Sequence, residues 1–505
     1  MLKIIKVITS SIMLENALGI DFQNTFARDL KGLYRESSSS KYPSSEILLL
    51  NDSLASELGI KLKNLHSKDG VDIFSGNKKH LNSITLAQAY SGHQFGRFNP
   101  NLGDGRALLL GEVLNKKGEL KDIQLKGSGP TPFSRRGDGK SALGPVLREY
   151  LISESMNALN IPTTRALAAV KTGEPVERET YLPGGVMTRV ASSHIRIGTY
   201  EYASLQNDNE LIKRLADYSI SRHFPDTGNV ENPYLALFAA ICNQQASLIA
   251  NWMSIGFIHG VMNTDNMSIS GETIDYGPCA FMNTYNPETV FSSIDVQGRY
   301  AFQNQPSILT WNLTRLAETF IPLVDNNKDE SVKLLTEVLQ LIKPVYTNYW
   351  LSIMRSKIGL SKEEHNDIEL IAQFLEIMAE EKADFTLSFR MLSKALIGDK
   401  SKIKKLFSNS RRLDGWIMLW QERVSQENIA VETIANSMDK INPLYIPRNH
   451  KVEEALDEAV FKNNMRSFNI MLSVMQNPYD EVESNASFAE APINEDKSYK
   501  TFCGT

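Results

Sequence analysis

Three side chains with oxygen ligands lie close together in the stretch from Gly256 to Phe281. They are Asp265, Asn266 and Asp275. An amide oxygen and a carboxylate are ligands that Mg²⁺ accepts while it bridges the phosphates of a nucleotide. A second carboxylate beside them can take the proton of an attacking hydroxyl group. These residue types therefore predict a metal-assisted transfer of a phosphorus-containing group.

The spacing of the stretch is that of a kinase catalytic loop with one residue changed. Kinase-type sites use a His-x-Asp-x-x-x-x-Asn segment, followed by a second metal-binding Asp in an Asp-Phe-Gly-like turn. Here His259 opens the segment, Asn266 closes it, and Asp275 is followed by Tyr and Gly. The position of the proton-accepting Asp is Val261, which cannot accept a proton. Either the site is inactive, or the neighbouring Asp265 has taken over this role.

The elements that must position this loop come earlier in the chain. A turn with Gly103, Gly105 and Arg106 leads into a strand predicted over residues 107–110. Such a turn lets backbone N–H groups approach phosphates closely. Taken alone, it is more typical of an ordinary hairpin, because Leu108 stands where a third glycine is expected.

A lysine and a glutamate follow on the next strand and helix. The strand predicted over residues 122–125 ends at Lys126, and a helix predicted over residues 144–159 carries Glu149 beside its apolar stripe. Kinase-like folds use this pairing to hold an ammonium group against nucleotide phosphates. The alternatives are a surface ion pair, worth about 0–1 kcal/mol, or no contact at all.

Residues 127–141 form a Gly- and Arg-containing insertion between this strand and helix, and they include Asp138 and Gly139. The end of the insertion resembles the tail of a Walker A loop, but Ser134 replaces the first glycine of that motif and no strand runs directly into it. We therefore reject a P-loop. An anion-binding lid and a flexible linker both stay open.

Two arginines, Arg189 and Arg196, follow on a strand-like segment. On one continuous strand, a spacing of seven directs them to opposite faces. Across a bend, both could address one phosphate. The spacing alone does not decide between these arrangements.

The second half of the chain predicts long helices. An apolar helix over residues 232–254 leads directly into the His259 loop. Further helices are expected over residues 308–324, 328–358, 362–380, 413–426 and 450–475. The order of turn, strand Lys, helix Glu, long helix, metal Asn and metal Asp is that of a bilobal, protein-kinase-like α+β fold.

We predict four parts along the chain. They are an N-terminal extension that wraps the core over residues 1–85, a β-rich N-lobe over 86–205, a helical C-lobe over 206–477 and a mobile acidic tail over 478–505. The first twenty residues favour a helix or strand, with a cleaved presequence as the alternative.

Composition excludes several partners. The 54 Lys and Arg residues against 59 Asp and Glu give a formal net charge of -5, so nothing favours nucleic acid. No apolar stretch approaches the roughly 20 residues needed to cross a bilayer. Three scattered cysteines, Cys242, Cys279 and Cys503, fit a reducing compartment. We expect a cytoplasmic protein without a membrane or nucleic-acid partner.

Several long and unusual strings resemble the selenoprotein O family of protein adenylyltransferases. They are Tyr90–Gly96, Asn101–Arg106, Leu125–Gly139 and His259–Asn266, and the resemblance extends over nearly the whole chain. The resemblance implies a kinase-like fold of the pseudokinase type that binds ATP in a flipped orientation. It further implies Mg²⁺-dependent transfer of AMP to Ser, Thr or Tyr hydroxyls of proteins, with release of pyrophosphate and with Mn²⁺ as an alternative metal.

The resemblance also implies a role for each candidate residue. Lys126 would grip a phosphate with Glu149 in support, Asp265 would accept the proton, and Asn266 and Asp275 would bind the metal. The residues implied to contact the nucleotide or to lie in the lid beside it are Gly103, Gly105, Arg106, Lys126, Asp138, Gly139, Glu149, Arg189, Arg196 and Asp275.

Two other hypotheses stay open. Transfer of the terminal phosphate would make the protein a kinase-like phosphotransferase. A non-catalytic, nucleotide-binding scaffold under redox control is suggested by Val261 together with Cys503. Some members of the resembled family end in a selenocysteine-containing motif, whereas Cys503 is the only thiol of this tail. It could form a disulfide with another protein or with Cys279.

Overall fold

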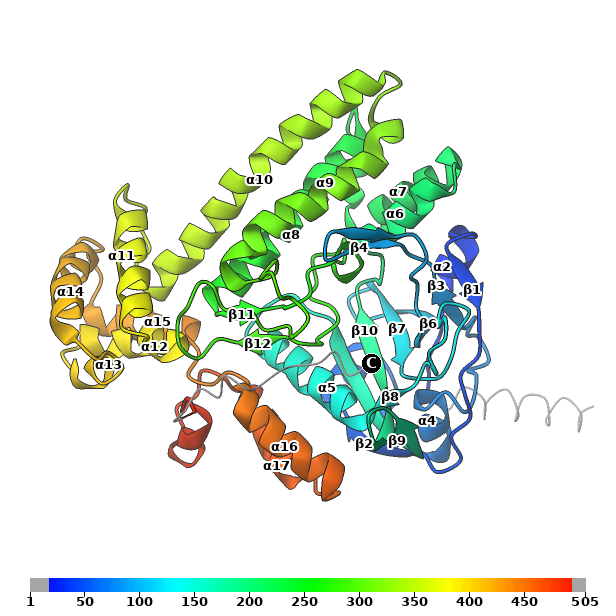
Figure 1. Cartoon of the computed structure of the whole chain (residues 1–505), viewed down its shortest axis with the longest axis horizontal. Coiled ribbons are helices and arrows are strands. Elements are labelled where there is room, and N and C mark those ends of the chain that lie inside the picture. The colour runs from blue at the N-terminus through cyan, green and yellow to red at the C-terminus, as the bar shows by residue number, and fades with distance from the viewer. Residues whose placement is uncertain (1–17, 493–505) are drawn as a thin grey trace, which may run out of the picture.

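The computed structural model describes residues 18–492, in which an antiparallel sheet lies beside a larger helical part (Figure 1). The predicted N-terminal helix or strand falls almost entirely outside these residues, and so does Cys503. Within residues 18–492, none of the helices is long and apolar enough to span a bilayer.

The sheet runs in the order β1-β3-β6-β7-β10-β9-β2, with every neighbouring pair antiparallel and with β8 added beside β10. The strands predicted over residues 107–110 and 122–125 are confirmed as parts of the longer β6 and β7. The bounds are β1 Tyr34–Glu36, β2 Glu46–Leu50, β3 Leu86–Gln88, β6 Ala107–Leu114, β7 Leu120–Lys126, β8 Ser141–Ala142, β9 Arg165–Glu177 and β10 Tyr181–Ala191.

Residues 18–85, predicted as a wrapping extension, contribute strands to both edges of this sheet. β1 pairs with β3 at one edge, and β2 pairs with β9 at the other. Leu18, Ile20 and Phe22 are buried in a small core with apolar residues of β6, β7, β9 and β10. This segment therefore completes the sheet that carries the site residues.

Helix α5 (Leu143–Ala158) crosses the sheet and packs against β9 and β10. The helix predicted over residues 144–159 is thus confirmed. Its stripe of Leu147, Tyr150 and Leu151 is buried, so the helix is held by apolar packing. This packing turns Glu149 toward the end of β7, where Lys126 lies.

The helical part contains the long helices predicted from the sequence. Helix α8 starts where Asn232 Oδ1 accepts a hydrogen bond from Leu235 N (3.1 Å), with Pro233 at the first position. The helices are α6 Ile197–Leu205, α7 Asn209–His223, α8 Pro233–Ser254, α9 Gln305–Val324, α10 Lys328–Lys357, α11 Asp367–Glu380, α12 Phe385–Leu396, α13 Ser401–Lys404, α14 Ser410–Ser425, α15 Val431–Ile441, α16 Asn449–Phe461 and α17 Arg466–Met475.

Two of the predicted helices were wrong in extent. The single helix predicted over residues 450–475 is two helices, because Asn463 adopts a left-handed conformation (φ 51°) between α16 and α17. Helix α11 begins at Asp367 instead of residue 362. The N–H groups of Ser361 and Lys362 donate to Glu427 (3.0 and 3.1 Å), and Glu364 N donates to Asp367 Oδ2 (2.9 Å) in the turn before the helix.

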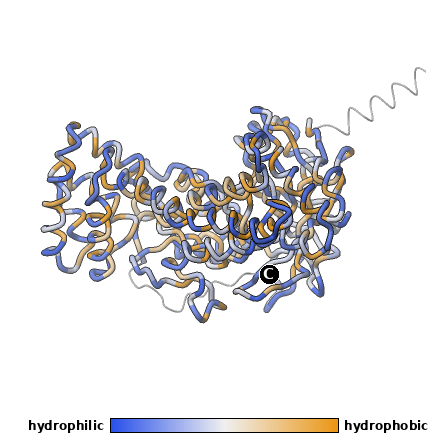
Figure 2. The backbone as a smooth tube through the Cα atoms, turned by 90° about the horizontal axis from the view of Figure 1, so that it is seen from above, coloured by the Kyte–Doolittle hydropathy of each residue, from blue (hydrophilic) through white to orange (hydrophobic). Residues whose placement is uncertain are grey.

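Helices α11–α15 form a second hydrophobic core, which includes Phe374, Phe389, Trp416 and Trp420. In Figure 1 this part lies at the left, next to the C-terminal end of α10, and it projects away from the sheet in both Figure 1 and Figure 2. The larger core spans α5, α8, α9 and the sheet. The elements that carry the candidate site, the sheet and α5, pack on this larger core.

The chain after α17 returns to the body of the protein. Leu444 N and Tyr445 N both donate to Pro478 O (2.8 and 3.1 Å), and Val482 N donates to the Tyr445 hydroxyl (3.2 Å). The first residues of the segment predicted as a tail are therefore held by main-chain hydrogen bonds.

Candidate active site

A cavity of about 650 Å³ lies between the sheet, α5 and the segment that follows α8. Its size is in the range of small-molecule sites, roughly 300–1,000 Å³. The cavity brings together all the site residues predicted from the sequence. The predicted residues that line it are Gly103, Gly105, Arg106, Lys126, Asp138, Gly139, Glu149, Arg189, Arg196, Asp265, Asn266 and Asp275.

Asp275 is the common partner of three cations. Lys126 Nζ and Arg189 Nη1 each lie 2.7 Å from its Oδ1, and Arg196 Nη1 lies 3.1 Å from its Oδ2. Burial alone would raise the pKa of Asp275, but the three cations hold it well below its usual range. Asp275 also has a left-handed backbone (φ 63°), which turns its side chain into the cavity. The carboxylate is therefore ionised.

The predicted pairing of the strand lysine with the helix glutamate is confirmed. Lys126 Nζ lies 2.6 Å from Glu149 Oε2, and both side chains are largely buried, so this is not a surface ion pair. Arg189 Nη1 approaches the other carboxylate oxygen at 3.2 Å. Gln124 Oε1 accepts from Arg189 Nε and Nη2 (3.2 and 2.7 Å). These contacts hold the side chains of Lys126 and Arg189 in one orientation.

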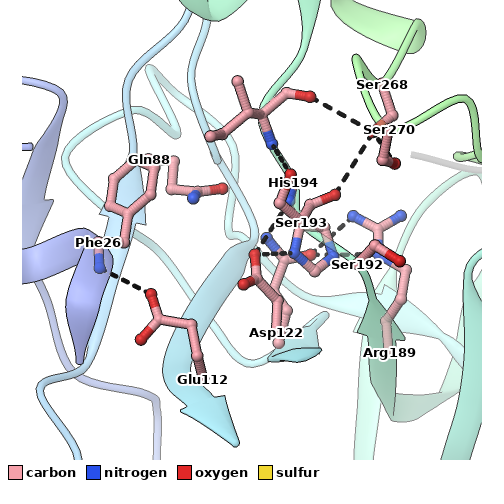
Figure 3. Close-up of polar contacts among 12 residues, drawn as sticks. Phe26, Gln88, Glu112, Asp122, Arg189, Ser192, Ser193, His194, Ser268 and Ser270 are labelled. Carbon is pink, nitrogen blue, oxygen red and sulfur yellow. Dashed lines mark hydrogen bonds and ion pairs between the residues drawn. The ribbon is translucent and has the colours of Figure 1, made fainter. Parts of the chain in front are cut away.

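A buried aspartate holds the bend that joins β10 to α6. Asp122 on β7 accepts from the main-chain N and the Nδ1 of His194, both at 2.9 Å (Figure 3). Its other oxygen pairs with Arg222 on α7, which also donates to Ser192 O. Burial lowers the pKa of His194 to about 4. The ring is therefore neutral and carries its proton on Nδ1.

This bend decides the arrangement that the spacing of the two arginines left open. Arg189 lies on β10 and Arg196 precedes α6, so the chain turns between them. Both guanidinium groups consequently reach the same carboxylate, Asp275. The ring of Tyr90 lies 4.5 Å from the Arg196 guanidinium, and Asp104 Oδ1 lies 3.8 Å from it.

We predict that Asp122→Asn destabilises the protein by about 3–5 kcal/mol, because it removes the nearer partner of a buried ion pair and leaves Arg222, among the described carboxylates, with only the 3.7 Å contact to Glu112. Chemical denaturation followed by circular dichroism measures this change. The matched control is Glu454→Gln, which removes the exposed partner of Lys451 and should change stability by no more than about 0.5 kcal/mol. Equal stability of Asp122→Asn and wild type would show that the bend does not depend on this carboxylate.

Asp265 is a buried carboxylate with one oxygen free of hydrogen bonds. It lies in the short η3 turn (Thr264–Asn266), where Gln94 Nε2 approaches its Oδ2 at 3.3 Å. Within residues 18–492, no partner is found for its Oδ1. Burial raises the pKa of Asp265 to about 7. Arg196 Nη1 donates to the main-chain O of Asp265 (2.9 Å), which links Asp265 to the cation cluster.

Asn266 presents its amide oxygen to the cavity, because its Nδ2 donates to Val261 O (2.9 Å). The amide oxygen of Asn266 and the ionised carboxylate of Asp275 are both ligands that suit a hard divalent cation. Phosphate or water oxygens would be its remaining ligands. Among the described residues no group of three or more His, Cys, Asp and Glu side chains is placed to hold a metal. A cation held by Asn266 and Asp275 would therefore need its other ligands from the nucleotide and from water.

The hairpin of β4 (Gly92–Gln94) and β5 (Arg97–Asn99) contacts the segment that carries Asp265. His93, which the sequence analysis did not include in the site, has its Nδ1 2.5 Å from Glu201 Oε1. Thr264 Oγ1 donates to Glu201 Oε2 (2.6 Å) and accepts from His93 N (2.7 Å). The hairpin therefore braces the residue that precedes Asp265.

The insertion over residues 127–141 packs onto the glycine turn. A Cβ at Gly103, which has φ 86°, would lie 2.5 Å from the Phe133 ring, so only glycine fits there. Asp138 pairs with Arg178 at 3.0 Å. Phe133, Ser134 and Arg135 also line the cavity, so the insertion forms part of its wall.

Besides His93, the sequence analysis missed the residues that hold the predicted arginines and Asp265, namely Tyr90, Gln94, Asp104 and Gln124. All four act by holding Arg189, Arg196 or Asp265, from positions far away in the chain. Tyr90 and Gln94 lie in the dense aromatic and glycine string that carried the family resemblance, which was the one available signal. Asp104 lies between two glycines already predicted to be in the site.

Comparison with known proteins identifies the class as a protein nucleotidyltransferase family. The family model described as "Protein adenylyltransferase SelO" matches residues 16–476, and this chain belongs to that family.

Proteins named "Protein nucleotidyltransferase YdiU" are similar to this chain. That of Rhizobium rhizogenes is 49% identical over 488 residues, covering 96% of this chain and 97% of the relative. That of Rhizobium johnstonii is 52% identical over 462 residues, covering 91% and 92%. That of Cereibacter sphaeroides is 50% identical over 486 residues, covering 96% and 99%. The resemblance stated from the motifs is confirmed.

Proposed function

We propose that this protein transfers AMP from ATP to Ser, Thr or Tyr hydroxyl groups of other proteins and releases pyrophosphate. The observation that carries this proposal is Asp265, a buried carboxylate in the cavity wall whose Oδ1 has no partner among the described residues, in a loop whose usual base position is Val261. Membership of the adenylyltransferase family and the names of the relatives support it.

The reaction makes one bond and breaks one. The acceptor oxygen forms a bond to the α-phosphorus, and the bond from that phosphorus to the bridging oxygen of the β-phosphate breaks. The carboxylate of Asp265 takes the hydroxyl proton, a role that suits a group whose pKa burial raises to about 7. Lys126, Arg189 and Arg196 lie together in the cavity wall, where they can neutralise the departing pyrophosphate.

Guanidinium groups suit a pyrophosphate because each can donate two parallel hydrogen bonds to phosphate oxygens. A divalent cation, proposed as Mg²⁺ with Mn²⁺ as the alternative, would be held by Asn266 and Asp275. When bound, it supplies charge neutralisation at the phosphates. We propose that Gly103, Gly105 and Arg106 contact the nucleotide, and that Asp138 and Gly139 lie in a lid beside it. The positions of these residues in the cavity wall support both proposals.

We also propose that the fold is the bilobal, kinase-like α+β arrangement, with an N-lobe over residues 86–205 and a C-lobe over 206–477. The antiparallel sheet, the crossing helix α5 and the buried pair of Lys126 and Glu149 support this arrangement. The position of Asp275 beside that pair supports it further.

Intact mass spectrometry of an acceptor protein after incubation with ATP and Mg²⁺ tests the proposed function. We expect a mass increase of one AMP group per modified hydroxyl. An increase of one phosphate group would instead identify a phosphotransferase, and an unchanged mass across acceptors would favour the scaffold hypothesis.

Redox control through a disulfide between Cys279 and Cys503 gains no support from the described residues. Cys279 is 1% exposed, and burial raises the pKa of its thiol to about 11. A thiol of this kind is a poor nucleophile, since the thiolate is the reactive form. The loop around Cys279 would have to open before such a bond could form.

Glycine at position 92 is required by the proposed base. A Cβ there would lie 2.6 Å from Asp265 Oδ1. We predict that Gly92→Ala lowers the rate of AMP transfer by about 100-fold, because a displacement of about 1 Å in a reacting group has an effect of this size. Labelling with ATP that carries radioactive phosphorus at the α position measures the rate. Gly415→Ala is the matched control, since a Cβ at that position meets nothing within 4 Å. Equal rates for the two variants would contradict the placement of Asp265.

A further inference from the structure

The turn over residues 292–300, between β12 (Ala280–Phe281) and η4 (Phe302–Asn304), exposes two apolar side chains. Ile294 is 63% exposed and Val296 is 91% exposed, while Asp295 between them is only 5% exposed. This is the reverse of the usual order, in which isoleucine and valine are buried and aspartate faces water. The inversion needs a physical reason.

The buried aspartate fixes the shape of the 292–300 turn. Asp295 Oδ1 accepts from Arg299 N (2.9 Å), and its Oδ2 accepts from Tyr300 N (2.8 Å). Asp295 N in turn donates to Ser292 O (3.1 Å). With its carboxylate inside the turn, the side chains on either side of Asp295 are directed outward.

The 292–300 turn is also fastened to the catalytic segment. The Tyr300 hydroxyl donates to Asn263 Oδ1 (2.6 Å), two residues before Asp265. Phe95 N donates to both the Tyr300 hydroxyl (3.2 Å) and Asn263 Oδ1 (3.0 Å). The turn therefore keeps a fixed position relative to the proposed base.

Ile294 belongs to the wall of the same cavity as Asp265. Neither Ile294 nor Val296 is part of a hydrophobic core among residues 18–492. Single exposed apolar residues are common on protein surfaces. Here, however, Ile294 lines the cavity that contains Asp265, and Val296 lies two residues further along the same braced turn.

We propose that Ile294 and Val296 are the docking surface for the acceptor protein, and that they contact an apolar side chain close in sequence to the hydroxyl residue that receives AMP. This inference rests on the proposed function and adds to it the local chemistry of the preferred acceptor. An extended segment whose hydroxyl residue enters the cavity must cross the cavity mouth. Its neighbouring side chains then meet the 292–300 turn.

Oriented peptide pools test this inference. Each pool carries one Ser, Thr or Tyr flanked by randomised positions, and AMP transfer is followed with α-labelled ATP. With the wild-type protein we expect pools with Val, Ile, Leu or Phe fixed at one flanking position to be labelled about 10-fold faster than pools with Ser or Asp there. Loss of one apolar contact in a specificity pocket has an effect of about this size.

The double variant Ile294→Ser with Val296→Ser should lose this preference. Val296→Ser alone, at a residue that does not line the cavity, should weaken the preference and still bind ATP with wild-type affinity, as measured by calorimetry. The matched control is Val332→Ser on α10, which is 43% exposed, does not line the cavity and should keep the preference. Labelling by the wild type without any flanking preference, or an unchanged preference in the double variant, would overturn the docking surface while leaving AMP transfer in place. Absence of α label from every pool would overturn the proposed function and this inference together.

Discussion

Replacing Asp275 by alanine is expected to lower AMP transfer to protein by at least about 1,000-fold, which corresponds to roughly 4 kcal/mol of transition-state stabilisation. The reason lies in the contacts of this carboxylate. It orients Lys126, Arg189 and Arg196 at distances of 2.7–3.1 Å. It is also one of the two proposed metal ligands. Without it, the three cations lose their common partner and the metal loses its only charged ligand from the protein.

The rate with α-labelled ATP measures this effect, and calorimetry in the presence of Mg²⁺ should show weaker ATP binding as well. Asp275→Asn keeps the shape of the side chain and serves as the second variant if the alanine protein is unstable. Asp226→Ala, at an exposed aspartate on the short η2 segment (Pro225–Asn229), is the control and should keep full activity. Undiminished labelling in both Asp275 variants would place the reacting centre elsewhere in the protein.

Asp265→Asn is expected to reduce AMP transfer by about 100- to 10,000-fold, the usual contribution of a positioned general base. ATP binding should stay within about twofold of wild type. Asparagine has the same shape but cannot accept the proton. Among the described residues, the side chain of Asp265 has one hydrogen-bond contact to lose, the 3.3 Å approach of Gln94, because Oδ1 has no partner there. Asp265→Asn therefore removes the proton acceptor with little change to the packing.

The companion variant is Val261→Asp, which restores an aspartate at the position where a kinase loop carries its base. In combination with Asp265→Asn it should not recover AMP transfer, because we propose that the acceptor hydroxyl meets Asp265. Full activity of Asp265→Asn would mean that another group takes the proton. Recovery by Val261→Asp would mean that the reaction uses the ordinary kinase position.

Much of the site could be predicted from the sequence because its signals are local in the chain. The metal pair and the altered base position lie within one loop. Lys126 and Glu149 lie on adjacent elements, so a strand end and a helix stripe were enough to pair them. The long helices follow from apolar content, as in α8, or from apolar periodicity, as in α9 with its buried Ile308, Leu309, Leu313, Leu316 and Phe320.

The remainder depends on contacts between distant segments, which periodicity does not encode. The bend that brings Arg189 and Arg196 to one carboxylate is fixed by Asp122 and Arg222, 100 positions apart in the chain. The break between α16 and α17 depends on a single left-handed asparagine in a stretch of otherwise helical composition. Asp295 gives no sequence signal at all, because an aspartate between two apolar residues predicts an exposed carboxylate.

The central claim is that the innermost phosphorus of ATP is the one transferred. Parallel reactions with ATP labelled at the α or the γ phosphorus, each followed by denaturing electrophoresis of an acceptor protein, test it most directly. The account predicts label on the acceptor from α-labelled ATP alone. Label arriving from the γ position alone would contradict it and identify a phosphotransferase.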